Sequence, residues 1–77
     1  MYRVIMTFVS DDTHEERHST EEEMISALQR LTRGPAASMG MIKKVIAVDT
    51  LDCTIFHSRW DGERMKIVFP TNLTSAR

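Results

Sequence analysis

The stretch that decides the fold reads Cys53-Thr54-Ile55-Phe56-His57-Ser58-Arg59-Trp60-Asp61-Gly62-Glu63-Arg64-Met65-Lys66-Ile67-Val68-Phe69. Two runs rich in β-branched and aromatic residues flank Asp61-Gly62, a dipeptide typical of a tight β-hairpin turn. A two-residue turn pairs Trp60 with Glu63 and gathers the large apolar side chains on one face of the hairpin. The other face is then basic, and its pairs are Arg59 with Arg64 and His57 with Lys66.

The chain before this hairpin predicts two more strands and one helix. Residues 2–9 alternate with the period of a strand, and residues 41–48 are rich in β-branched side chains with Ile42, Ile46 and Val48 on one face. Residues 10–18 contain no apolar side chain, so we expect a solvated loop there. Residues 19–33 predict a helix, because Ser19 or Thr20 opens a capping box and Gly34-Pro35 ends the apolar stripe.

These elements predict an α+β fold of the order β-α-β-β-β, a two-layer domain with one helix packed on a small, mainly antiparallel sheet. The domain is expected to span residues 1–70, with residues 71–77 as a flexible tail. The order of the strands stays open, since the strands before and after the helix can be adjacent or separated by another strand.

The composition sets limits on size and class. The chain has 77 residues, of which 42% are hydrophobic and 27% charged, as in a globular domain rather than a disordered one. A chain of this length buries only about 60% of its unfolded surface, so a partner or a homodimer would extend its core. The lone Cys53 and the short apolar start predict a cytoplasmic protein without a membrane partner.

Charge is distributed unevenly along the chain. The formal net charge is −1, yet residues 1–23 hold seven carboxylates against two arginines, and the remainder is basic. The acidic segment resembles a phosphate backbone in its charge and is therefore the first candidate surface for binding a protein. Its candidate residues are Asp11, Asp12, Glu15, Glu16 and Glu22.

The basic face of the hairpin is the alternative binding surface. Arg59, Arg64 and Lys66 are the candidate residues for holding the phosphates of a nucleic acid, with an aromatic ring stacking on a base. The acidic first third of the chain would repel a polyanion, which argues against this alternative.

The segment His14-Glu15-Glu16-Arg17-His18 matches the H-E-x-x-H pattern of zinc hydrolases. A zinc-dependent hydrolase using His14, Glu15 and His18 is a remote alternative, because the charged residues between the motif positions and the absence of a third ligand argue against it. We therefore expect no catalytic residue, no metal and no cofactor, and a protein that is not an enzyme.

In its format the chain resembles small bacteriophage-encoded accessory proteins. The features that carry the resemblance are the opening strand Tyr2 to Val9, the capped helix Ser19 to Arg33, and Val48 to Phe56 running into the Asp61-Gly62 hairpin. The resemblance implies a non-enzymatic protein that binds and modulates or inhibits a host protein or complex in the host cytoplasm. It assigns no function to any individual residue.

Overall fold

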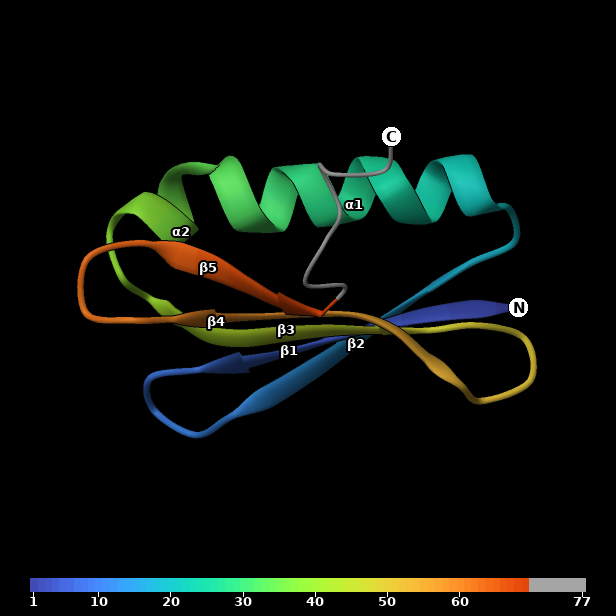
Figure 1. The fold of residues 1–77 in the computed structure, drawn as a ribbon, viewed down its shortest axis with the longest axis horizontal. Coiled ribbons are helices and arrows are strands. Elements are labelled where there is room, and N and C mark those ends of the chain that lie inside the picture. The colour runs from blue at the N-terminus through green and yellow to red at the C-terminus, as the bar shows by residue number, and fades with distance from the viewer. Residues whose placement is uncertain (70–77) are drawn as a thin grey trace.

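The computed structural model describes residues 1–69 and shows one helical layer on one sheet (Figure 1). The elements in chain order are β1 (Tyr2–Phe8), β2 (Thr13–His18), α1 (Glu21–Arg33), α2 (Pro35–Ser38), β3 (Ile42–Val48), β4 (Thr54–Trp60) and β5 (Met65–Phe69). An α+β fold with one main helix against a largely antiparallel sheet is thus confirmed. The expected tail at 71–77 lies outside the described residues.

The five strands form one sheet in the order β2-β1-β3-β4-β5, and every neighbouring pair is antiparallel. Since β2 and β3 both run antiparallel to β1, they are parallel to each other with β1 between them. Helix α1 makes the crossover from β2 to β3, and it lies over β1, β2 and β3.

The prediction of a loop at residues 10–18 is wrong for most of that range. Residues 13–18 form strand β2 on the edge of the sheet. The chain reverses after β1, where Asp11 adopts a positive φ of 72° and the Phe8 amide donates to the Asp12 carbonyl over 2.9 Å. An edge strand gains backbone hydrogen bonds and needs no apolar side chains, so hydrophobic patterning gives no signal for it. The predicted order β-α-β-β-β therefore lacks one strand.

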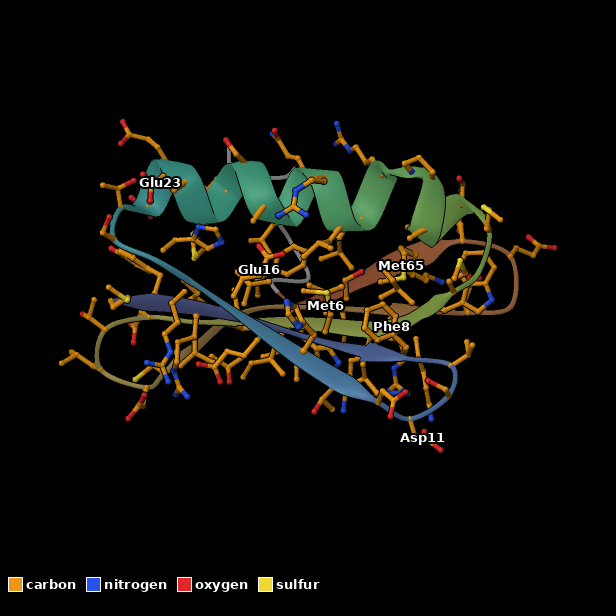
Figure 2. The ribbon with its side chains drawn as sticks, turned by 180° about the vertical axis from the view of Figure 1, so that it is seen from behind. Met6, Phe8, Asp11, Glu16, Glu23 and Met65 are labelled. Atoms are coloured by element: carbon orange, nitrogen blue, oxygen red, sulfur yellow. The ribbon has the colours of Figure 1, made fainter. Side chains whose placement is uncertain are left out.

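Helix α1 begins where the capping box predicts. The Glu23 amide donates to the Thr20 hydroxyl over 3.2 Å, and the Ser19 amide donates back to the Glu23 carboxylate over 3.3 Å. The buried stripe of α1 packs on the sheet, and the core cluster comprises Val4, Met6, Met24, Ala27, Leu28, Leu31, Ile42, Val45 and Ala47. Figure 2 shows Met6 and Met65 between the helix and the sheet.

Strand β3 contains a β-bulge that the sequence pattern does not reveal. Thr7 pairs with Lys44 and Phe8 pairs with Ile42, so Lys43 is the extra residue. The bulge reverses the inward and outward alternation after Ile42. The expected face of Ile42, Ile46 and Val48 is therefore wrong, since Ile42 lies with the buried Val45 and Ala47, whereas Ile46 lies on the opposite face.

The hairpin of β4 and β5 is confirmed, but its loop is four residues long rather than two. The Asp61 carboxylate accepts hydrogen bonds from the amides of Glu63 and Arg64 over 2.9 and 3.0 Å, which holds residues 61–64 in the loop. Trp60 consequently pairs with Met65 and not with Glu63. The shift is two residues, so the side chains from Ser58 to Trp60 and from Met65 to Ile67 keep the faces that were expected for them. A bulge at Val68 then sets Phe69 opposite His57 and not opposite Thr54.

Candidate functional site

The sheet face away from α1, called the open face here, carries three cations in one row. Lys44 lies opposite Arg59, and Arg59 lies opposite Lys66, so the three side chains stand on adjacent strands about 5 Å apart. We call these three residues the basic row. Like charges directly opposite each other destabilise a sheet, and no carboxylate within residues 1–69 forms an ion pair with any of the three.

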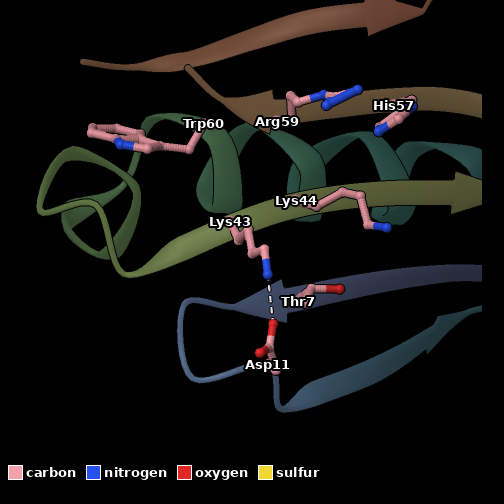
Figure 3. Close-up of a pocket in the computed structure, with 7 residues that line it drawn as sticks. All are labelled: Thr7, Asp11, Lys43, Lys44, His57, Arg59 and Trp60. Atoms are coloured by element: carbon pink, nitrogen blue, oxygen red, sulfur yellow. Dashed lines mark hydrogen bonds and ion pairs between the residues drawn. The ribbon is translucent and has the colours of Figure 1, made fainter. Parts of the chain in front are cut away.

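A fourth cation lies next to the basic row because of the bulge in β3. Lys43 forms an ion pair with Asp11 in the β1–β2 turn, and this contact holds the pKa of the Asp11 carboxyl below its ordinary value. Figure 3 shows this ion pair beside Lys44, which points away from it along the open face. The bulge thus places Lys43 beside Asp11 and leaves Lys44 without a carboxylate partner in the part of the chain described.

An open depression of about 490 Å³ lies at this end of the open face (Figure 3). Its walls carry more positive than negative charge, since the only carboxylate among them already faces Lys43. The lining residues are Thr7, Asp11, Lys43, Lys44, His57, Arg59 and Trp60.

His57 reports the positive potential of the depression. Partial burial lowers the pKa of the imidazole, and the neighbouring charges of Arg59 and Lys44 lower it further. The buried Nε2 atom has no hydrogen-bond partner among the described residues. Partial burial and the two neighbouring cations therefore both favour the neutral form of this imidazole.

Trp60 forms the wall at the end of β4 and also lines a second depression beside α2. Its indole lies against Gly40, where an added Cβ would come within 3.3 Å of the Trp60 Cζ2 atom. Gly40 also has a positive φ of 72°, so this position favours glycine on both counts. The close contact holds one side of the indole against Gly40.

The structure separates the five candidate acidic residues and neutralises three of them. Asp11 pairs with Lys43, and Glu15 pairs with Arg17 over 2.9 Å. Glu16 lies on the opposite face of β2 and pairs with Arg30 of α1 over 2.8 Å (Figure 2). The other two, Asp12 and Glu22, are exposed and have no cationic partner within residues 1–69.

The H-E-x-x-H motif lies on strand β2 and not on a helix. On a strand His14 and His18 point to the same face but stand about 13 Å apart, while Glu15 points to the opposite face. Two histidines at this separation cannot share one zinc ion. Within residues 1–69 no group of three or more potential ligand side chains is close enough to hold a metal.

Of the three candidate nucleic-acid contacts, the structure brings together Arg59 and Lys66. Arg64 lies in the β4–β5 loop and lines the second depression, where α1 ends. Lys66 takes the place opposite Arg59 that Arg64 was expected to fill, and Lys44 lies on the other side of Arg59. Sequence reasoning missed Lys44 and Thr7 as site residues, because only the bulge and the pairing of β1 with β3 bring them beside Arg59.

No protein-family model matches the chain, and searches of curated proteins and of solved structures gave no significant match. In the described part of the chain, no helix has both the length and the apolar character needed to cross a bilayer.

Proposed function

We propose that this protein is a small, non-enzymatic nucleic-acid-binding module that holds the phosphates of a single strand on the open face of its sheet. One observation carries the proposal: Lys44, Arg59 and Lys66 form a row of cations without carboxylate partners among the described residues. A folded chain tolerates adjacent like charges at a cost in stability. Phosphate groups spaced along a nucleic-acid backbone would remove that cost.

The shape of the open face favours a single strand over a duplex. Within residues 1–69 no helix or ribbon projects from this face to enter a groove of a double helix (Figure 1). Single strands bind instead across flat basic surfaces with aromatic side chains on which bases stack. Trp60 lines the depression, and Phe69, opposite His57, is 48% exposed.

The acidic segment has less support as the binding surface. Three of its five candidate carboxylates already neutralise cations of the same chain, and two of these ion pairs connect β2 with α1 and the β1–β2 turn with β3. Binding of a host protein or complex, as the resemblance to phage accessory proteins implies, stays a prediction that would rest on Asp12 and Glu22.

Charge reversal with a matched control tests the proposal. The binding of a fluorescent oligothymidine is measured by anisotropy at low salt for the wild type and for the double variant Lys44→Glu/Arg59→Glu. The control Arg33→Glu/Arg64→Glu changes the net charge equally, at two arginines that line the second depression and not the open face. We expect the first variant to lose at least tenfold in affinity, and the control to lose threefold or less.

Circular dichroism must show that both variants are folded. Equal loss in the two double variants would mean that only net charge matters, and it would refute a site on the open face. Absence of binding by the wild type at low salt would refute nucleic-acid binding altogether. Capture of a protein that depends on Asp12 and Glu22 would favour the acidic surface instead.

A further inference from the structure

Strand β5 leaves a hydrophobic sheet edge without a partner in the described part of the chain. It pairs with β4 on one side only, so the backbone amides and carbonyls of its outer side have no strand to bond. Its sequence, Met-Lys-Ile-Val-Phe, has one charged residue in five. The opposite edge strand β2 has the sequence Thr-His-Glu-Glu-Arg-His, and its charges protect it against pairing with another strand.

An apolar groove runs beside the same edge. Helix α1 packs on β1, β2 and β3, so the side chains of β4 and β5 under its flank are only partly covered. Ile25 of α1 and Ile67 of β5 are each 44% exposed across this groove, which has a volume of about 310 Å³. Leu28 of α1 and Phe56 of β4 also line it. A free strand edge and an exposed apolar groove therefore lie side by side.

We infer that β5 is the interface of a homodimer, in which it pairs antiparallel with β5 of a second copy around a two-fold axis at Ile67. The one two-fold register that pairs all five residues sets Ile67 opposite Ile67 of the second copy and Lys66 opposite Val68 of the second copy. No cations meet directly in this register, and the remaining pairs are apolar.

Two-fold pairing of β2 with β2 of a second copy, at the other edge of the sheet, is unfavourable. The two-fold registers centred on the middle of β2 set either Glu15 opposite Glu15 or Glu16 opposite Glu16 of the second copy. Like charges directly opposite destabilise a strand pair. Charge thus favours self-association at β5 over self-association at β2.

The two-fold axis at Ile67 also accounts for the groove. Strand pairing extends the sheet, so both helices lie on the same side and the two grooves face each other across the axis. Ile25 and Ile67 of both copies then share one apolar cleft, which removes exposed hydrophobic surface from water. The open faces join as well and bring the two basic rows onto one surface, although the dimer does not depend on nucleic-acid binding.

Sedimentation velocity, from micromolar to millimolar concentration, tests the dimer. We expect the wild type to approach twice the 8.9 kDa mass of the chain. Ile67→Lys and Ile67→Glu are each expected to be monomers, because each places a charge opposite itself at the axis, and their equimolar mixture is expected to dimerise again. The control Leu51→Lys replaces a residue that is 80% exposed and distant from β5, and it should dimerise as the wild type does.

A cysteine at the axis tests the register without adding charge. Residues directly opposite in an antiparallel pair have Cα atoms about 4.5–5.5 Å apart, a separation that a disulfide spans. Ile67→Cys in a Cys53→Ser background should therefore form a disulfide-linked dimer under mild oxidation, whereas Leu51→Cys in that background should not. This measurement decides the question if the charged variants fail to fold.

Three results would overturn the inference. A wild type that stays monomeric at millimolar concentration refutes the dimer and leaves the edge to another occupant, such as the residues that follow β5. A dimer that persists in folded Ile67→Lys and Ile67→Glu has its interface elsewhere. Equal crosslinking at positions 67 and 51 shows that the contact is not specific.

Discussion

Two β-hairpins form the opposite edges of the sheet, and they differ in how their charges are balanced. In the hairpin of β1 and β2, Glu15 and Glu16 pair with Arg17 and Arg30 of the same chain. In the hairpin of β4 and β5, Arg59 and Lys66 lie opposite each other without a carboxylate partner in residues 1–69. The acidic hairpin uses its charge to stabilise the fold, whereas the charge of the basic hairpin remains available to a ligand.

This difference shows why net charge is a poor guide to the partner. The chain has a formal net charge of −1, and its first third is acidic. Three of those carboxylates, Asp11, Glu15 and Glu16, sit beside arginines or a lysine, so their field is screened at short range. The field that extends from the open face comes from the cations that lack such neighbours.

The largest expected effect concerns the basic row. Lys44→Gln/Arg59→Gln/Lys66→Gln should weaken oligothymidine binding by about tenfold per cation, since hydrogen bonds to charged groups contribute about 1.5–3 kcal/mol each. The slope of log K against log salt should be about −2 for the wild type, as expected when three phosphates of a single strand are neutralised. It should approach zero in the triple variant. A slope that is the same in both proteins would place the contacts elsewhere.

The next effect concerns the acidic hairpin and is one of stability. Glu16→Gln should lower the free energy of unfolding by about 1 kcal/mol, because it weakens half-buried contacts to Arg30 and His18. Arg59→Gln, the matched change in the basic hairpin, should leave the free energy of unfolding unchanged or raise it slightly by relieving repulsion from Lys66. Urea unfolding measures both. Equal destabilisation by the two changes would remove the contrast between the hairpins.

Measuring stability at low pH provides a control for the contribution of the Glu16 carboxylate to the free energy of unfolding. Partial burial raises the pKa of the Glu16 carboxyl, but Arg30 and His18 together outweigh it, so the net direction is downward. A depressed carboxyl pKa in the folded state stabilises the protein above the unfolded pKa of about 4.3, and the contribution is lost as pH falls through the folded value. The stability difference between wild type and Glu16→Gln should therefore shrink below about pH 4.

A smaller effect is expected in the core beneath the basic hairpin. Ser58 of β4 is fully buried opposite Val45, and its hydroxyl has no hydrogen-bond partner within residues 1–69. Ser58→Ala should raise the free energy of unfolding by about 1 kcal/mol or less, because it removes an unsatisfied polar group. Ser38→Ala is the control, since the Ser38 hydroxyl donates to the Pro35 carbonyl over 3.1 Å. A loss of stability in Ser58→Ala would show that the hydroxyl is satisfied.

The smallest effect is the pH dependence of binding. The pKa of His57 lies below its ordinary value, first because of partial burial and then because of Arg59 and Lys44. Phosphates on the basic row would offset those charges and raise the pKa, so binding should tighten as pH falls below about 6.5. A rise of half a unit corresponds to about threefold in affinity. His57→Gln should lose that increment, and an identical pH profile in both proteins would exclude His57 from the site.

Much of the fold follows from local signals in the sequence. The capping box at Thr20, the apolar stripe of α1 and the alternation in β4 and β5 each depend on near neighbours, and each was predicted. Strand β2 was not predicted, because an edge strand is stabilised by backbone pairing with β1 and by ion pairs to distant residues such as Arg30. Neither the backbone pairing nor the ion pairs produce a pattern in the spacing of hydrophobic residues.

The site was predicted in part for the same reason. Arg59 and Lys66 share a face in any register that differs from the expected one by two residues. The prediction of their common face is therefore correct, although the predicted loop length was wrong. Lys44 depends on the bulge at Lys43 and on the pairing of β3 with β4, both of which are tertiary features. The neutralisation of the acidic segment likewise required the positions of Arg17, Arg30 and Lys43 in space.

NMR mapping of a bound oligonucleotide tests the central claim most directly. Amide shifts of the ¹⁵N-labelled protein are followed during titration with a short oligothymidine at low salt. The proposed site predicts that the largest changes fall on the open face, at Thr7, Lys44, His57, Arg59 and Lys66, while the amides of α1 stay in place. Changes centred on Asp12 and Glu22, or no changes at millimolar oligonucleotide, would contradict it.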